Sequence, residues 1–270
     1  MFKRVMVAVV CIPLIFVVFY LLPPVWLPIT VSLLSMIAVH EVLWSTGFVK
    51  NGYISSLSIV LAGLVPFWVY IGQGMRSALV GIFFYFLLIF LVAISSHYTV
   101  TLEKMGGSFF FAMLIPYFLS TFVRLNGLEK GGYLILIPLV AAFASDSFAL
   151  FAGMAFGKHK LAPELSPKKT VEGSVGGLVG AVALCIIYGV VLHVAFKQEV
   201  SYVRFALYGF LGSIVSQIGD LSFSYIKRQY GLKDFGNIFP GHGGVLDRFD
   251  SVIFCAPLME ILIRWFPAVF

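Results

Sequence analysis

The stretch SVGGLVGAVALCIIYGVVLHVAF, residues Ser174 to Phe196, contains no Asp, Glu, Lys or Arg. An α-helix needs about 20 predominantly apolar residues to cross the hydrocarbon core of a bilayer, so this stretch is long enough to span one. A helix also satisfies its own backbone hydrogen-bonding groups, which lipid cannot do for it. The stretch therefore predicts a transmembrane helix.

The composition of the whole chain agrees with this prediction. Of the 270 residues, 60% are hydrophobic and 11% are charged, and the mean hydropathy is +1.02. Soluble globular domains carry about 25% charged residues. A folded chain of this size with so few polar groups could not cover its surface in water, so we expect an integral membrane protein.

Apolar runs of similar length recur between short polar breaks, and they predict an all-α, polytopic fold of about nine transmembrane helices. The first run follows MFKR without a small-residue cleavage site, so we interpret it as a retained helix and not as a signal peptide. The nine expected spans are Val5 to Leu22, Val25 to Trp44, Tyr53 to Gly72, Ser77 to Ser95, Ser108 to Val123, Tyr133 to Phe156, Ser174 to Phe196, Tyr202 to Tyr225 and Phe249 to Trp265.

The distribution of Lys and Arg among the polar breaks predicts the orientation of the chain. Of the 18 basic residues, 12 fall on the side of the N-terminus and 6 on the other. Because basic loops stay in the cytoplasm, we expect the N-terminus and both long basic loops on that side of the cytoplasmic membrane. The net charge of +6 suits a protein that faces anionic lipid, and it requires no nucleic acid as a partner.

The chain divides into three regions by the distribution of its polar residues. Residues 1–73 contain the first three expected helices, and residues 74–130 contain the fourth and fifth. Both regions are almost featureless apolar sequence. Residues 131–270 contain the last four helices and two long cytoplasmic loops, and here the polar residues become organised. We therefore expect the functional site in this third region.

An acid stands inside the sixth expected helix, at Asp146 in FASDSFALFAGMAF. A charged side chain within a membrane span costs a few kcal/mol even on lenient scales, so such residues face the bundle interior and commonly serve a function. The other interpretation is an acid that is hydrogen-bonded to a neighbouring helix and contributes to packing. The sequence leaves both open.

The eighth expected helix has a polar face. In YVRFALYGFLGSIVSQIGDLSFSYIKRQYG the residues Ser213, Gln217, Asp220 and Ser224 recur at helical spacing, so they lie along one side. Such a face does not point at lipid. It is expected to line a polar cavity or the polar face of another helix, with Asp220 below the cytoplasmic end of its helix.

Two basic loops on the cytoplasmic side suit phosphate groups. The first, GKHKLAPELSPKKTVEGSVGG, combines four lysines with closely spaced glycines, so ammonium and backbone N–H groups can both approach a phosphate. Ser174 in this loop is a candidate cap for the helix that follows. The alternative is an ordinary positive-inside loop. This alternative is less favoured, because two such loops share one side of the membrane with two intramembrane acids.

The second loop, KRQYGLKDFGNIFPGHGGVLDRFD, runs from Lys227 to Asp250. Its GHGG segment cannot be a regular helix, so its backbone is available to a ligand. Asp247 and Asp250 flank Arg248 at the head of the last helix, on one side of it. Oxygen ligands from Asp146, Asp220 and Asp247 would suit a hard cation such as Mg²⁺, the usual partner of a nucleoside triphosphate.

At these residues the chain resembles a known family. The segment SYIKRQYGLKDFGNIFPGHGGVLDRFD, Ser224 to Asp250, is similar to the signature of the phosphatidate cytidylyltransferases, also called CDP-diacylglycerol synthases. The segment SDSFALFAGMAFGKHKLAPELSPKKTVEGSVGG is similar to that family's second conserved region, with Val171 where members often carry Trp. The specific similarity covers about the last half of the chain, from Asp146 onward.

The resemblance implies an enzyme, a nucleotidyltransferase, and the reaction that it would catalyse. CTP and phosphatidate would give CDP-diacylglycerol and pyrophosphate in phospholipid biosynthesis. The resemblance also implies a dependence on Mg²⁺, with a second metal ion left open. The protein would be an all-helical homodimer in the lipid bilayer, with its active site facing the cytoplasm.

As a mechanistic hypothesis, we assign roles to individual residues, with Asp220, Asp247, Lys227, Arg228 and Arg248 as the catalytic set. Asp220 and Asp247 would be the leading metal ligands, with Asp146 as a third. The triphosphate would be held by the first basic loop, at Ser166, Lys168, Lys169 and Thr170. The lipid phosphate or the leaving group would be held by Lys227, Arg228, Lys233 and Arg248. The substrate-binding set also includes His242, Gly243 and Gly244.

Two other functions remain compatible with the sequence. A CTP-dependent membrane lipid kinase of the polyprenol type could use a similar site and transfer the γ-phosphoryl group instead. An ion-coupled transporter could use Asp146 and Asp220 as ion sites. Transporter folds often contain internal repeats, and none is visible in this sequence, so the transporter is the less favoured alternative.

Overall fold

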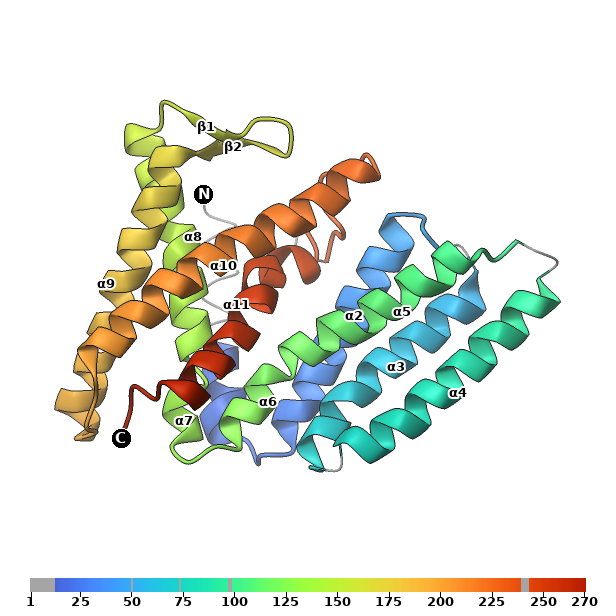
Figure 1. Cartoon of the computed structure of the whole chain (residues 1–270), viewed down its shortest axis with the longest axis horizontal. Helices are drawn as coiled ribbons and strands as arrows, with labels where there is room; N and C mark the ends of the chain where they lie inside the picture. The colour runs from blue at the N-terminus through green and yellow to red at the C-terminus, as the bar shows by residue number, and fades with distance from the viewer. Residues whose placement is uncertain (1–12, 50, 73, 97–98, 239–242) are drawn as a thin grey trace. The chain divides into compact units, whose positions relative to one another are not determined.

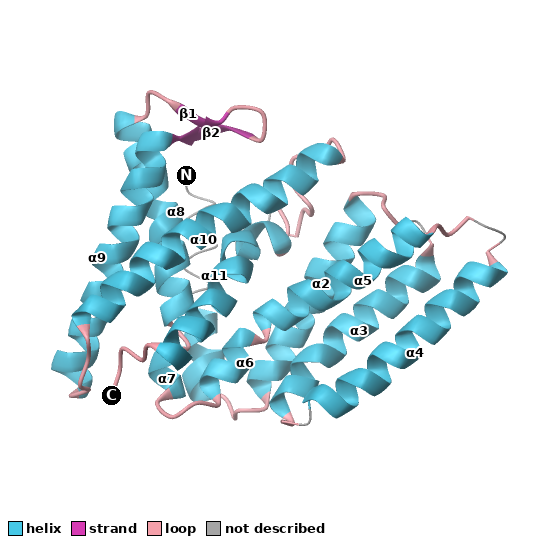
Figure 2. Cartoon of the chain, in the orientation of Figure 1, coloured by secondary structure: helices cyan, strands magenta, loops and turns pink. Residues whose placement is uncertain are grey.

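The computed structural model describes residues 13–49, 51–72, 74–96, 99–238 and 243–270. Within that part of the chain, helices make up almost all of the regular structure, and one hairpin of two short strands supplies the rest (Figure 2). The helices are η1 (Val17–Leu21), α2 (Trp26–Ser45), α3 (Gly52–Tyr70), α4 (Gly74–Ser95), α5 (Leu102–Leu119), α6 (Thr121–Asn126), α7 (Gly131–Leu134), α8 (Ile137–Phe156), α9 (Val171–Phe196), α10 (Tyr202–Gln229) and α11 (Leu246–Trp265). The strands are β1 (Lys160–Ala162) and β2 (Ser166–Thr170).

Six helical segments of the described residues are long and apolar enough to cross a membrane. They are Trp26–Ser45, Gly52–Tyr70, Ala78–Ser95, Leu102–Asn126, Gly131–Phe156 and Val171–Phe196. The prediction of an all-α, multi-pass membrane protein is therefore confirmed. The eighth and ninth expected spans are the helices α10 and α11, which carry more charged residues and are not among these six.

The helix boundaries follow from local chemistry more than from hydropathy. The fifth expected span was placed from Ser108, but α5 begins at Leu102. Thr101 precedes it, and its hydroxyl oxygen accepts the backbone N–H of Lys104 at 3.4 Å. A capping residue therefore starts the helix in the polar segment that a hydropathy pattern excludes.

The chain forms two compact units, and each is made of segments that are distant in sequence. The first unit contains residues 1–124 and 232–248, and the second contains residues 125–231 and 249–270. This division differs from the three sequence regions 1–73, 74–130 and 131–270, because residues 232–248 return to the first unit. The predicted functional residues are therefore divided between the two units.

The first unit is a layer of apolar helices. In this unit α2 packs against α3 and α5, and α3 packs against α4 and α5 (Figure 1). Few polar groups lie between the helices, and some of them pair with each other or with the backbone. The hydroxyl of Ser32 donates to the carbonyl of Gly63 at 2.8 Å, and the hydroxyls of Ser58 and Tyr85 are 3.0 Å apart.

In the second unit, α8, α9 and α10 pack closely because glycines stand at the contacts. A Cβ at Gly209 of α10 would lie 2.5 Å from the Cα of Val182 and 2.6 Å from the carbonyl oxygen of Ala181. Small residues of this kind let helix backbones approach in a membrane, where association depends on packing and not on a hydrophobic driving force.

We expect Gly209→Ala to destabilise the second unit. The added methyl group meets backbone atoms of α9, which cannot rotate away, and overpacking of this kind costs about 1–3 kcal/mol. The melting temperature of the detergent-solubilised protein measures the effect. Gly106→Ala is the matched control, because a Cβ at Gly106 meets no atom within 4 Å. Equal melting temperatures for the two variants would contradict the close packing of α9 and α10.

Candidate functional site

The first basic loop forms a β-hairpin at the start of α9. The strands β1 and β2 pair antiparallel, with Lys160 opposite Thr170 and Ala162 opposite Ser166. The sequence predicted a loop here, and the segment contains Pro163 and Pro167. A proline is tolerated in a two-stranded hairpin, since each strand has a free edge. The hairpin presents Lys168 as an exposed side chain, whereas Lys169 is half-buried.

Thr170 joins the hairpin to α9. Its hydroxyl oxygen accepts the N–H of Gly173 at 3.1 Å, so Thr170 is the N-cap of this helix. The sequence offered Ser174 as the candidate cap, but Ser174 lies inside α9 and its hydroxyl donates to the side chain of Gln217. The predicted phosphate-binding residue Thr170 therefore also has a structural role.

Two contacts hold the hairpin on α10 within the second unit. The ammonium of Lys169 forms an ion pair with Asp220. The Nε of Arg228 donates to the carbonyl of Leu165 at 3.1 Å. The structure thus brings together two segments that the sequence singled out separately, the SPKKT loop and the polar face of the eighth expected helix.

The polar face of α10 packs against polar groups of other helices at the two positions that precede Asp220, Ser213 and Gln217. The hydroxyl of Ser213 lies 2.8 Å from that of Ser145 on α8. The side-chain amide of Gln217 donates to the carbonyl of Ser174 on α9 at 3.2 Å. Nearer the C-terminal end of α10, Ser224 donates to Asp220 at 3.3 Å. Of the two expected arrangements, a face against another helix is the one observed at Ser213 and Gln217.

A second ion pair lies between α10 and α11 in the same unit. The ammonium of Lys227 is 3.8 Å from the carboxylate of Asp250, and the two side chains are 10% and 12% exposed. The other oxygen of Asp250 accepts the N–H of Ser251 at 2.8 Å. The hydroxyl of Ser251 in turn donates to Asp146 at 2.8 Å. Asp146 is therefore linked to a neighbouring helix, as the packing interpretation expected, and its side chain is exposed.

Asp250 is the acid of this cluster that the sequence reading left without a role. In the sequence it stands out only as part of the signature and as a neighbour of Arg248. In the structure both Asp220 and Asp146 lie close enough to repel its charge, while Lys227 attracts it. The cluster in the second unit therefore contains three acids and two lysines, the latter being Lys169 and Lys227.

In the first unit, Asp247 organises the loop that precedes α11. One oxygen of its carboxylate accepts three backbone N–H groups, those of Phe235 at 2.8 Å, Gly236 at 3.4 Å and Gly244 at 2.9 Å. Gly243 has a φ of 79°, a conformation that side chains rarely adopt, and a Cβ there would lie 2.7 Å from Asp247. Asp247 thus anchors the backbone around it.

The remaining predicted residues of this loop fall into two groups. Lys233 and Arg248 are exposed, as residues that meet a phosphate from solution must be. His242 lies outside the described residues, as does Pro240 of the signature. Glu41 of α2 is a residue that the sequence reading missed, and its carboxylate accepts two N–H groups of this loop. The sequence does contain a signal for Glu41, because it is a lone acid within a mainly apolar run. A charged residue in a membrane span commonly serves a function, and this argument holds for Glu41 as it does for Asp146 and Asp220.

The donor chemistry of the acids suits magnesium. Carboxylate oxygens are the ligands that Mg²⁺ prefers. Among the described residues, no three His, Cys, Asp or Glu side chains converge in a way that could hold a metal ion. Asp220 is instead paired with the ammonium of Lys169. We therefore derive no chemical step through a metal ion.

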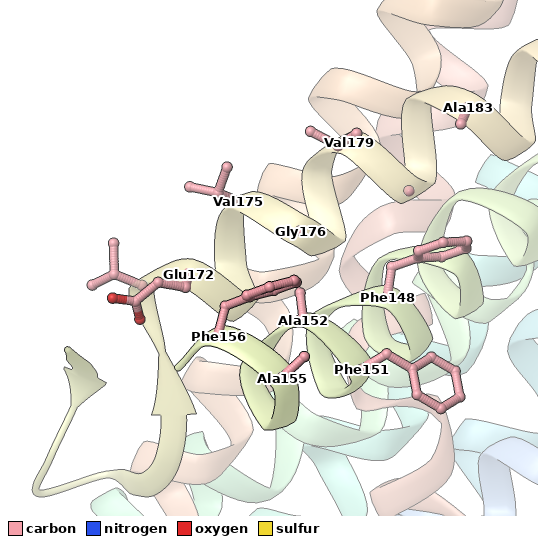
Figure 3. Close-up of a pocket in the computed structure, with 12 residues that line it drawn as sticks. Phe148, Phe151, Ala152, Ala155, Phe156, Glu172, Val175, Gly176, Val179 and Ala183 are labelled. Atoms are coloured by element: carbon pink, nitrogen blue, oxygen red, sulfur yellow. The ribbon is translucent and has the colours of Figure 1, made fainter. Parts of the chain in front are cut away.

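An apolar groove of about 730 Å³ lies between α8 and α9. Figure 3 shows Glu172 at one end of the groove and Ala183 at the other, with Phe148, Phe151 and Phe156 along it. The carboxylate of Glu172 accepts the N–H of Lys158 at 3.1 Å and lies 2.6 Å from Nδ1 of His159. None of the predicted site residues lines the groove. The predicted phosphate-binding and metal-binding residues therefore do not form part of it.

A family model described as the cytidylyltransferase family matches residues 2–266 of this chain. The match includes the first five expected helices, where the sequence reading found only hydrophobicity. It therefore extends over both compact units. It includes the cluster of acids and lysines in the second unit and the loop around Asp247 in the first.

Several curated proteins are similar to the chain. The phosphatidate cytidylyltransferase of Bacillus subtilis (strain 168) is 39% identical over 169 residues, which are 62% of this chain and 61% of that protein. The one from Thermotoga maritima is 35% identical over 60% of each chain. The one from Rickettsia bellii is 35% identical over 65% of this chain and 78% of that protein. The matched segment thus spans about three fifths of the first two relatives.

We expect Lys227→Met to destabilise the protein strongly. The substitution leaves Asp250 buried without its ammonium partner, and breaking a buried pair in this way costs about 3–5 kcal/mol. The double variant Lys227→Met, Asp250→Asn should recover part of the loss, because no unpaired charge remains. Melting temperatures measure both effects.

Lys233→Met is the matched control, because Lys233 is exposed. Surface substitutions of this kind change stability by about 0.5 kcal/mol or less. If Lys227→Met melted at the same temperature as Lys233→Met, the pair with Asp250 would have no role in stability.

Proposed function

The chain belongs to the cytidylyltransferase family, and we propose that it transfers the cytidylyl group from CTP to phosphatidate. The products would be CDP-diacylglycerol and pyrophosphate. The observation that carries the proposal is the ion pair between Lys169 and Asp220, because it joins the two segments that resemble the family's conserved regions. The relatives named phosphatidate cytidylyltransferase support the choice of substrates.

In the proposed reaction, one bond forms and one breaks at the α-phosphorus of CTP. An oxygen of the lipid's phosphate monoester attacks this atom, and the bond to the bridging oxygen of the β-phosphate breaks. The nucleophile is already anionic at about pH 7, so no strong general base is required. The barrier is chiefly the crowding of negative charge, and catalysis consists of positioning the phosphates and neutralising them.

The basic residues of the hairpin, of α10 and of the segment from Lys233 to Arg248 would position and neutralise the phosphates. Lys168 and Lys169, with Ser166 and Thr170, would hold the triphosphate at the hairpin. Lys227, Arg228, Lys233 and Arg248 would hold the lipid phosphate or the leaving pyrophosphate, and His242, Gly243 and Gly244 would contribute to substrate binding. The exposure of Lys168, Arg228, Lys233 and Arg248 supports these roles. For Lys169 to reach a phosphate, it would have to leave Asp220.

The proposal includes Mg²⁺, with Asp220, Asp247 and Asp146 as its ligands and a second metal ion left open. The oxygen donors of these acids support it. When bound, the ion would neutralise phosphate charge. Asp220 is paired with the ammonium of Lys169, so its carboxylate could serve as a ligand only if the ammonium turned to the triphosphate instead.

The proposed topology has nine spans, with the N-terminus and the site on the cytoplasmic side of the membrane. The excess of basic residues on that side supports it, with 12 of the 18 Lys and Arg there. The proposal includes a homodimer, which the resemblance to the family supports.

Labelled CTP tests the reaction directly. Incubation of the purified protein with phosphatidate and CTP that is labelled at the α-phosphorus should put the label into lipid, because the cytidylyl group carries that atom. A CTP-dependent lipid kinase transfers the γ-phosphoryl group and leaves the α-label in solution. Label in lipid only from γ-labelled CTP would replace the proposed reaction by the kinase.

We expect Asp220→Asn to abolish nearly all turnover in correctly folded protein. The substitution removes the charge that holds Lys169 and the hairpin, and it removes a proposed ligand. Lys104→Ala is the control, because Lys104 is not one of the proposed site residues and its ammonium donates to the carbonyl of Thr99. Near-normal turnover in Asp220→Asn, or an equal loss in Lys104→Ala, would contradict the assignment.

A further inference from the structure

Glu41 is a buried acid, and no other Asp, Glu, Lys or Arg occurs in its helix. It lies in α2, is 5% exposed and belongs to the first unit with residues 232–248. Neither the signature nor the proposed mechanism includes it. Burying a carboxylate is costly unless hydrogen bonds compensate for the lost water, so its partners show what it is for.

The partners of Glu41 are backbone groups at the start of α11. One carboxylate oxygen accepts the N–H of Val245 at 3.0 Å, and the other accepts the N–H of Leu246 at 2.8 Å. Since α11 begins at Leu246, these N–H groups belong to the helix terminus, where no carbonyl of the helix can accept them. A negative charge there also interacts favourably with the helix dipole. Glu41 therefore caps α11 from a different helix.

The loop before α11 is shaped to admit this carboxylate. A Cβ at Gly244 would lie 2.3 Å from the carboxylate of Glu41, and a Cβ at Gly236 would lie 2.4 Å from its Oε1. Any other residue at either position would collide with Glu41. The second glycine of HGG thus makes room for an acid of the same chain.

Glu41 and Asp247 together hold one segment of backbone from two sides. Asp247 accepts the N–H groups of Phe235, Gly236 and Gly244, and Glu41 accepts the next two along the chain. Five donors of this loop therefore end on two carboxylates. Loss of Glu41 would free the segment that carries Asp247, while leaving the rest of α2 in its apolar surroundings.

We propose that Glu41 is a positioning residue for cytidylyl transfer, which fixes the start of α11 and so the places of Asp247 and Arg248. The inference rests on the proposed function, in which both of those residues serve the reaction. Glu41 acts through the backbone of residues 244–246. Misplacement of a reacting group by about 1 Å can cost about 100-fold in rate, so a residue that only positions others can still control turnover.

The test is Glu41→Gln, which keeps the size of the side chain. One oxygen remains as an acceptor, but the amide nitrogen now faces a backbone donor. Amide hydrogen exchange at Val245 and Leu246 should accelerate, and kcat should fall by about 10- to 100-fold. The KM for CTP should change by no more than about threefold, because the phosphate-binding residues of the hairpin are untouched.

Ser35→Ala is the matched control on the same helix. Ser35 is fully buried, and its hydroxyl has no hydrogen-bond partner among the described residues. This variant should leave both the exchange rates and kcat unchanged. A general loosening of α2, in contrast, would affect both variants and would lower their melting temperatures.

Gly244→Ala gives a second test that retains Glu41. Its methyl group would collide with the carboxylate, so it should reproduce the fall in kcat, and the combination with Glu41→Gln should be less than additive. Unchanged exchange in Glu41→Gln, or accelerated exchange with unchanged kcat, would overturn the proposal. If the wild-type protein transferred no cytidylyl group, the proposed function would fail, and the exchange rates alone would decide whether Glu41 holds the loop.

Discussion

The ion pair between Lys169 and Asp220 is the contact on which the polar part of the second unit depends. The side chain of Asp220 is only 25% exposed, and a charge that is largely withdrawn from water is costly unless it is paired. The hairpin meets this requirement by placing Lys169 against it. The same contact joins the SPKKT strand to α10, and the hydrogen bond from Arg228 to the carbonyl of Leu165 adds to it. Charge pairing thus arranges the segment that would meet a triphosphate.

The two units satisfy their buried acids in different ways. In the second unit, Asp220 and Asp250 are paired with lysines, so a bound phosphate could compete for the ammonium groups. In the first unit, Asp247 and Glu41 accept backbone N–H groups, which are fixed by the chain and do not leave. The first arrangement suits groups that exchange partners during a reaction. The second suits a frame that is organised before the substrate arrives.

The sequence was sufficient to predict most of the helices. Apolar runs of about 20 residues locate membrane helices because the bilayer has a fixed thickness, and eight of the nine runs coincide with helices of the described residues. The polar face of α10 was also predictable, because Ser213, Gln217 and Asp220 recur at helical spacing. These inferences depend on neighbours along the chain.

Contacts between distant segments were beyond the reach of such patterns. Nothing in the apolar run around Glu41 indicates that its carboxylate meets the N–H groups of Val245 and Leu246. Asp220 pairs with Lys169 and not with Lys168, because successive side chains of strand β2 point to opposite sides. The strand itself is not evident from a sequence that contains two prolines. The partner of Asp250 depends likewise on how α10 and α11 pack. Tertiary structure decides which charges meet, whereas local sequence decides only which are present.

The central claim, that the charge of Lys169 holds the hairpin on α10, can be tested by amide hydrogen exchange of residues 160–170 in the purified protein. Lys169→Gln keeps much of the side chain's length and removes its charge, so exchange in both strands should accelerate. Lys168→Gln changes the neighbouring exposed residue and should leave exchange as in the wild type. Equal protection of the hairpin in the wild type and in Lys169→Gln would contradict the account.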